Sequence, residues 1–163
     1  MGYIMLLLVF LSGCTIPQTE NEAKEELIIE NNNSNYNVNS SYSGEHLASQ
    51  GVPYIIFNKN DYDRAVRERK IILLYFYAEW CPICHAEQVE TIAAFNELQR
   101  HDVVGFRVNY RDSDVDLLEE ELAKEHGITS QHTKIIIKDG ERILKAPDRW
   151  SKQRYLNEIG KIK

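Results

Sequence analysis

The chain alternates between short apolar runs and longer amphipathic stretches from residue 48 to residue 163. The clearest run covers residues 71–77, IILLYFY, which is nearly all apolar, as expected of a central strand covered on both faces. Asp139-Gly140 lies between apolar residues 135–137 and 143–144, and this arrangement predicts a β-hairpin. Further strands are predicted at residues 54–57 and 103–108.

Apolar residues at helical spacing predict helices around these strands. The longest begins at Cys81 and runs to about residue 99. Its buried side is expected to carry Ala86, Val89, Ile92, Ala93 and Phe95. The other predicted helices are residues 61–69 after an Asn60 cap, a helix capped by Ser113 or Asp114 that ends at His126-Gly127, and residues 151–162 with Tyr155, Leu156 and Ile159 facing inward. Residues 48–163 therefore form one predicted α/β domain.

The first 13 residues are mostly apolar and end at small residues, which is typical of a secretory signal peptide. The stretch is too short to span a bilayer as a helix of the mature protein. Residues 11–14, LSGC, resemble the lipobox of prokaryotic lipoproteins. This resemblance implies cleavage before Cys14 and a lipid on its sulfur. We therefore expect an extracytoplasmic protein whose lipid on Cys14 anchors it to a prokaryotic membrane.

Residues 14–47 have the composition of a disordered tether, rich in Asn, Ser and Glu and without apolar periodicity. Six Glu and one Lys between residues 15 and 45 carry −5 of the formal net charge of −6. The domain at residues 48–163 is therefore nearly neutral, and it has no basic face for nucleic acid.

The candidate chemistry lies in WCPIC at residues 80–84, between the apolar run and the longest predicted helix. Two thiols separated by two residues suit reversible disulfide formation or metal ligation. A helix that starts at Cys81 points free backbone N–H groups at its sulfur, which stabilises the thiolate. Pro82 fits the first helical turn. With Cys14 lipidated, Cys81 and Cys84 are the only thiols that remain.

The segment YFYAEWCPICH at residues 75–85 resembles the active-site region of thioredoxins. FRVNYRDSD and ELAKEHGITSQHTKIIIKDGE resemble the third strand, third helix and terminal hairpin of that family, in the same order. The resemblance implies a thioredoxin fold, in which a central mixed sheet has helices on both faces. It also implies exchange with protein thiols or disulfides, in which Cys81 attacks and Cys84 resolves the mixed disulfide. Trp80 and Pro82 would support substrate binding.

Three positions depart from the thioredoxin pattern. Gln131-His132-Thr133 replaces the loop that carries a cis-proline and binds substrate backbone, so His132 is expected near Cys81. A cis bond before a residue other than proline costs about 2.5–4 kcal/mol, so we expect a trans Gln131–His132 peptide. Tyr75 replaces a buried Asp that accepts a proton from the resolving thiol, and His132 can take that role. Arg107 replaces a Lys, and either stabilises a thiolate or only edges the sheet.

Two functions follow from these residues. The first is a membrane-tethered thiol–disulfide oxidoreductase, which we expect to be monomeric and free of cofactors, and to exchange electrons with a membrane partner in either direction. The alternative is a metal-binding or metal-delivery lipoprotein, because Cys81, Cys84 and His132 would suit zinc or copper. An imidazole nitrogen within about 4 Å of both sulfurs would favour the metal, and a ring turned away from them would favour exchange.

Overall fold

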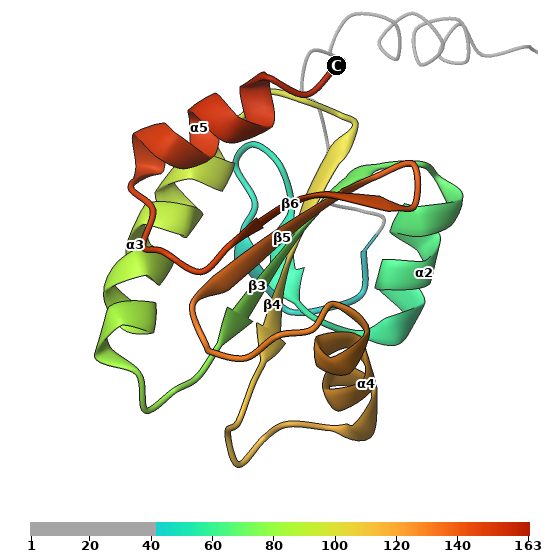
Figure 1. The fold of residues 1–163 in the computed structure, drawn as a ribbon. Helices are drawn as coiled ribbons and strands as arrows, with labels where there is room; N and C mark the ends of the chain where they lie inside the picture. The colour runs from blue at the N-terminus through green and yellow to red at the C-terminus, as the bar shows by residue number, and fades with distance from the viewer. Residues whose placement is uncertain (1–41) are drawn as a thin grey trace, which may run out of the picture. The chain divides into compact units, whose positions relative to one another are not determined.

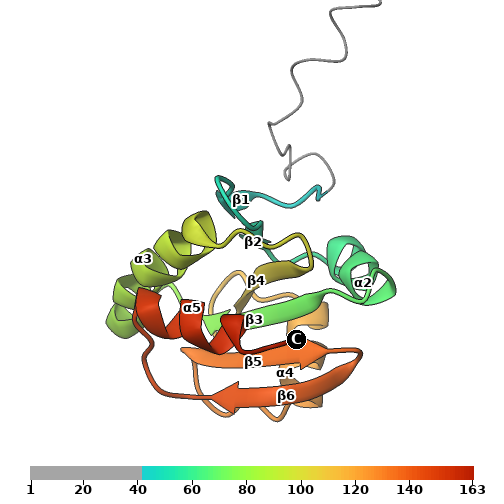
Figure 2. The same cartoon turned by 90° about the horizontal axis from the view of Figure 1, so that it is seen from above.

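The computed structural model describes residues 42–163, in which six strands form one mixed sheet. The strand order is β1-β2-β4-β3-β5-β6 (Figure 2). β3 pairs in parallel with β4 and antiparallel with β5, so the sheet is mixed at its centre. The strands are β1 (His46–Ala48), β2 (Tyr54–Ile56), β3 (Ile71–Tyr77), β4 (Val103–Asn109), β5 (Thr133–Lys138) and β6 (Glu141–Ala146).

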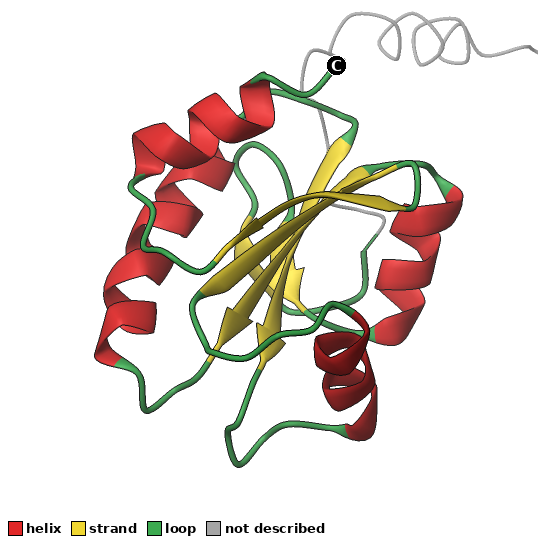
Figure 3. Ribbon diagram, viewed as in Figure 1, coloured by secondary structure: helices red, strands yellow, loops and turns green. Residues whose placement is uncertain are grey.

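Helices cover both faces of this sheet (Figures 1 and 3). The helices are α2 (Lys59–Arg67), α3 (Pro82–Glu97), α4 (Leu117–Glu125) and α5 (Lys152–Gly160). α3 and α5 lie on one face, and α2 and α4 lie on the other (Figure 1). The predicted α/β thioredoxin fold, with a central mixed sheet between helices, is confirmed. Within residues 42–163, no helix has the length and apolar character needed to cross a membrane.

The central strand β3 is buried at all seven positions, as the apolar run predicts. Its side chains alternate between two hydrophobic cores because successive residues of a strand point to opposite faces. Leu73, Tyr75 and Tyr77 pack in the core beneath α3 and α5. Leu74 and Phe76 pack in the core beneath α2 and α4. β3 therefore fixes the position of the loop that leads to the cysteines.

Two predicted helix caps are wrong. α2 is capped by Asn58 and not by Asn60, because the Asn58 side chain accepts a hydrogen bond from the Asp61 N–H at 2.9 Å. α4 is capped by Asp116 and not by Ser113 or Asp114. The Asp116 carboxylate accepts from the Glu119 N–H, and the Glu119 carboxylate accepts from the Asp116 N–H. This reciprocal pair satisfies two backbone donors at once, which is why the helix begins there.

The predicted buried side of α3 is also partly wrong. Ala86 and Ala93 are exposed, and Val89 is 67% exposed, whereas Phe95 is buried and Ile92 packs at the edge of the core. The face that turns inward instead carries Cys84, Glu87, Thr91, Ala94 and Phe95. The helix is therefore rotated relative to its apolar pattern, because Glu87 and Thr91 find polar partners inside the protein.

Other expectations concern the two ends of the domain. The Asp139-Gly140 hairpin is confirmed, and both residues have positive φ, as a type I′ turn requires. At the other end, β1 begins at His46, before residue 48, and the Ser43 and Gly44 N–H groups donate to the Asp61 carboxylate. The predicted signal peptide, Cys14 and residues 14–41 of the tether lie outside the described residues.

Candidate active site

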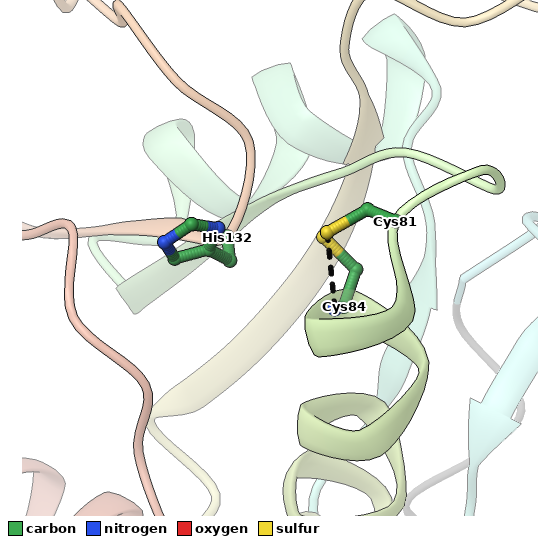
Figure 4. A group of neighbouring side chains, drawn as sticks. All are labelled: Cys81, Cys84 and His132. Atoms are coloured by element: carbon green, nitrogen blue, oxygen red, sulfur yellow. Dashed lines mark hydrogen bonds between the residues drawn. The ribbon is translucent and has the colours of Figure 1, made fainter.

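Cys81 is the N-cap of α3, at the end of the loop that follows β3. Its backbone is extended, with φ −94° and ψ 107°, and Pro82 begins the helix. The Cys81 Sγ accepts a hydrogen bond from the backbone N–H of Cys84 at 3.3 Å (Figure 4). This N–H is one of the donors that a helix leaves unpaired at its N-terminus. The N-terminus of the helix therefore places a backbone N–H at the Cys81 sulfur, where the sequence predicts one.

The two cysteines are free thiols in different surroundings. Cys81 is 3% exposed and lies at the surface end of the helix, whereas Cys84 is completely buried. Burial raises the pKa of the Cys84 thiol to about 12, and its hydrogen bond with Cys81 adds to this shift. Cys84 is therefore protonated at neutral pH. Cys84 must therefore lose a proton before it can react, and Cys81 is the thiol nearer the surface.

The surface beside Cys81 is apolar. The Trp80 side chain is 57% exposed, and its indole N–H donates to the Arg111 carbonyl at 2.9 Å. Pro82 is exposed, and the Ile83 side chain is 48% exposed. The indole is therefore held in place while its ring stays accessible, which suits the substrate-supporting role predicted for Trp80 and Pro82.

The loop before β5 brings His132 to the two sulfurs (Figure 4). One imidazole nitrogen and the sulfurs of Cys81 and Cys84 all lie within 4.8 Å of one another. The predicted proximity of His132 to Cys81 is confirmed. The Gln131–His132 peptide is trans, as predicted, and His132 has a φ of 51°. A side chain other than glycine or asparagine is uncommon in this left-handed region.

The rest of this loop is anchored in the sheet. Gln131 is half-buried, whereas Thr133 is buried as the first residue of β5. The Thr133 hydroxyl donates to the Ser130 carbonyl at 2.8 Å and so closes the loop around Gln131 and His132. The predicted tripeptide therefore lies beside the cysteines, with His132 at its tip.

A buried ion pair that the sequence analysis missed lies beneath the site. The Lys134 ammonium is 2.6 Å from the Glu87 carboxylate, and both side chains are completely buried. The Glu87 Oε1 also accepts from the backbone N–H of Trp150 at 2.8 Å and from the Tyr155 hydroxyl at 2.9 Å. Burial lowers the pKa of Lys134, and the hydrogen bond to Glu87 opposes this shift. The pair joins α3 to β5 and α5.

Lys134 also holds the loop that carries His132. Its ammonium donates to the His132 carbonyl at 2.7 Å and to the Asp148 carbonyl at 2.5 Å. With Glu87, these two carbonyls give the ammonium three acceptors, which matches its three protons. Two signals in the sequence point to the pair: Lys134 interrupts an apolar strand, and Glu87 lies one helical turn after Cys84, on the same face.

Tyr75 and Arg107 occupy the two remaining positions that depart from the thioredoxin pattern. The Tyr75 hydroxyl lies 3.3 Å from the Cys84 carbonyl and 3.5 Å from the Glu87 carboxylate. Burial raises the pKa of Tyr75, so its phenol cannot serve as a base at neutral pH. The Arg107 guanidinium lies 4.6 Å from the centre of the Tyr77 ring and donates to the Gln88 side chain at 3.3 Å. Among the described residues, the Arg107 guanidinium therefore contacts Tyr77 and Gln88.

The mixed sheet and the Cys81–Cys84 pair at the start of a helix define a thiol–disulfide oxidoreductase of the thioredoxin fold. A family model described as Thioredoxin matches residues 53–160. The chain therefore belongs to the thioredoxin family. No curated protein sequence matches it.

Solved structures support the same fold. Thioredoxin from Aeropyrum pernix superposes with a TM-score of 0.55 at 19% identity, over 75% of this chain and 98% of that one. Trxlp from Edwardsiella tarda gives a TM-score of 0.54 at 18% identity, over 63% and 94% of the two chains. The N21Q mutant of thioredoxin from Halobacterium salinarum gives 0.52 at 17% identity, over 71% and 93%. These similarities show a shared fold.

Proposed function

We propose that this protein exchanges disulfides with protein substrates outside the cytoplasm, while a lipid on Cys14 holds it to a prokaryotic membrane. The observation that carries the exchange chemistry is the asymmetry of the two thiols. Cys81 has its sulfur at the N-terminus of α3, whereas Cys84 lies behind it with a raised pKa. One sulfur is thus arranged to attack and the other to resolve.

Reduction of a substrate proceeds in two exchanges. The Cys81 thiolate attacks one sulfur of the substrate disulfide, forms an Sγ–S bond, and expels the other substrate sulfur as a thiolate with its electron pair. Cys84 then loses its proton, and its sulfur attacks the Cys81 Sγ. The Cys81–Cys84 disulfide forms, and the second substrate sulfur leaves. Oxidation of a substrate is the same sequence in reverse.

His132 is the side chain best placed to take the proton from Cys84. Its imidazole nitrogen is within 4.8 Å of the sulfur, and imidazole accepts protons near neutral pH. Tyr75 is excluded by its raised pKa. The Oε1 of Glu87 accepts from the Lys134 ammonium, the Trp150 backbone N–H and the Tyr155 hydroxyl, and its Oε2 faces the Tyr75 hydroxyl at 3.5 Å. A proton relay through His132 therefore replaces the buried acid of other thioredoxins.

Trapping of a mixed disulfide tests this proposal. The Cys84→Ser chain should form a covalent adduct with a peptide whose single cysteine is joined in a disulfide to a poorly nucleophilic thiol, because the chain lacks the resolving sulfur and the released thiol reverses the exchange only slowly. The Cys81→Ser/Cys84→Ser chain is the control and should form none. Mass spectrometry identifies the adduct and the sulfur that carries it. An adduct absent from the Cys84→Ser chain under conditions that reduce the peptide with the parent protein would contradict the assigned roles.

The direction of exchange depends on the reduction potential of the Cys81–Cys84 pair. A value of about −270 mV would make the protein a reductase, and a value of about −120 mV would make it an oxidant. In either case the pair must be recycled after each turnover. We propose that a membrane electron-transfer partner does this, because the tether would keep the site close to the membrane.

Tethering through Cys14 is supported by the LSGC sequence at residues 11–14 and by the polar stretch that follows. Cys14→Ala should prevent lipidation and shift the protein from the membrane fraction to an unprocessed or released form. Mass spectrometry of the native N-terminus checks this, with the Cys81→Ser chain as a control that should keep its lipid. Cleavage at another residue with an unmodified Cys14 thiol would rule out the anchor.

A further inference from the structure

The three donor atoms of Cys81, Cys84 and His132 converge on one small volume. They lie within 4.8 Å of one another, so a single ion could be at about 2.8 Å or less from each, against usual Zn–S bonds of about 2.3 Å and Zn–N bonds of about 2.0–2.1 Å. Movements of less than about 1 Å would complete the coordination. We infer that the reduced protein binds a thiophilic d¹⁰ cation, zinc(II) or copper(I), through these three side chains.

The imidazole is available for this role. The Nδ1 of His132 is buried and has no hydrogen-bond partner among the described residues. A buried polar atom without a partner is unfavourable, so an added ligand at this nitrogen would be favoured. Figure 4 shows one ring nitrogen on the side of the sulfurs and the other on the far side of the ring. The ring is thus oriented so that one nitrogen can join the two thiols.

The backbone keeps the imidazole in this position. His132 is at the tip of its loop with a φ of 51°, and its carbonyl is held by the buried Lys134 ammonium at 2.7 Å. Both cysteines are likewise fixed at the first turn of α3. The ligands are therefore positioned before an ion arrives, and little order must be created on binding.

The neighbouring histidine does not offer the same possibility. The His85 Nδ1 lies 3.2 Å from the Tyr77 hydroxyl, and its Nε2 lies 2.5 Å from the Glu79 carbonyl. Both nitrogens are therefore already engaged. The available ligands are two thiolates and one imidazole. Thiolates select zinc and copper(I) over harder cations, and with zinc the fourth tetrahedral position would be left for solvent or substrate.

Metal binding and disulfide exchange would exclude each other. The ion needs both sulfurs as thiolates, and a divalent ion releases two thiol protons when it binds. A Cys81–Cys84 disulfide removes two of the three ligands. The metal-bound form would therefore hold the protein out of exchange until the ion is withdrawn. This inference concerns the resting dithiol and does not depend on turnover of any substrate.

Metal titration of the reduced protein tests the inference. The full-length chain with Cys14→Ser is used in detergent, so that Cys81 and Cys84 are its only thiols. Zinc(II) and copper(I) are titrated in separate experiments against a chromophoric competitor. We expect one equivalent of at least one ion to bind. His132→Asn should weaken this binding at least about tenfold, and asparagine tolerates the positive φ of this position.

Two controls isolate the site. His101→Ala removes an exposed imidazole and should leave the affinity unchanged. Oxidation with diamide, which takes two electrons and two protons from the thiols, should abolish binding. Binding of either ion with this pattern supports the site and identifies its metal. Equal affinity in the His132→Asn chain, or no stoichiometric binding of either ion, would overturn it. Mixed-disulfide trapping in the Cys84→Ser chain is independent of either result.

Discussion

Replacing Cys81 by serine is expected to lower turnover of a peptide disulfide by about a thousandfold or more, although a thiol stays in the site. The remaining thiol, Cys84, is completely buried, and its pKa is raised to about 12. Burial is the larger cause of this raised pKa and is retained in the Cys81→Ser chain, so only a very small fraction of Cys84 would be thiolate at pH 7, against a few per cent for an ordinary thiol with a pKa of about 8.5. Serine cannot replace the sulfur that attacks.

Alkylation kinetics separate this effect from the loss of the second thiol. In the Cys81→Ser chain, reaction of Cys84 with iodoacetamide should be slow at pH 7 and should still be rising with pH above about pH 9, because burial keeps the pKa of Cys84 raised above that of an ordinary thiol. In the Cys84→Ser chain, Cys81 should react much faster at pH 7. Similar rates in the two chains, or a plateau for Cys84 near pH 9, would show that burial does not suppress its reactivity.

Removal of either partner of the buried Glu87–Lys134 pair should destabilise the reduced protein by about 3–5 kcal/mol. Lys134→Met leaves a carboxylate in the core whose remaining donors are the Trp150 backbone N–H, the Tyr155 hydroxyl and, at 3.5 Å, the Tyr75 hydroxyl. Glu87→Gln leaves a buried ammonium with two carbonyl acceptors but no counter-charge. In both cases a completely buried charge loses the ion that compensates it.

A double-mutant cycle measures the coupling. The Glu87→Gln/Lys134→Met chain should be destabilised by less than the sum of the single variants, with a difference of at least about 2 kcal/mol, since neither charge remains. Urea unfolding gives each free energy of unfolding. Lys152→Met is the matched control: its 2.7 Å pair with Glu97 is about half exposed, so its loss should cost about 1 kcal/mol or less. Additive effects of the two buried substitutions would contradict the coupling.

Much of the fold was predictable from local patterns. The apolar run of β3 and the Asp139-Gly140 turn depend on near neighbours in the chain, and both are observed as predicted. The sequence also predicted Cys81 at a helix N-terminus and His132 beside it. These predictions are correct because a family motif places the residues together or because the geometry is set within a few residues.

The buried polar residues could not be predicted in this way. The apolar pattern of α3 placed Ala86, Val89 and Ala93 inside, whereas the structure buries Glu87 and Thr91. A carboxylate is stable there only because Lys134, Trp150 and Tyr155 reach it from distant parts of the chain. The pairing partners of a charged side chain are set by the tertiary fold, so a pattern read along one helix treats that side chain as exposed.

The low exposure of Cys81 limits which substrate disulfides can reach its sulfur. Cys81 is only 3% exposed, and it lies at the N-terminus of α3 next to Trp80 in the chain. A disulfide packed inside a finished domain cannot approach such a sulfur without opening that domain. A loose segment can lie across the indole and deliver its sulfur directly. The site would therefore favour disulfides in loosely folded segments over disulfides packed inside folded domains.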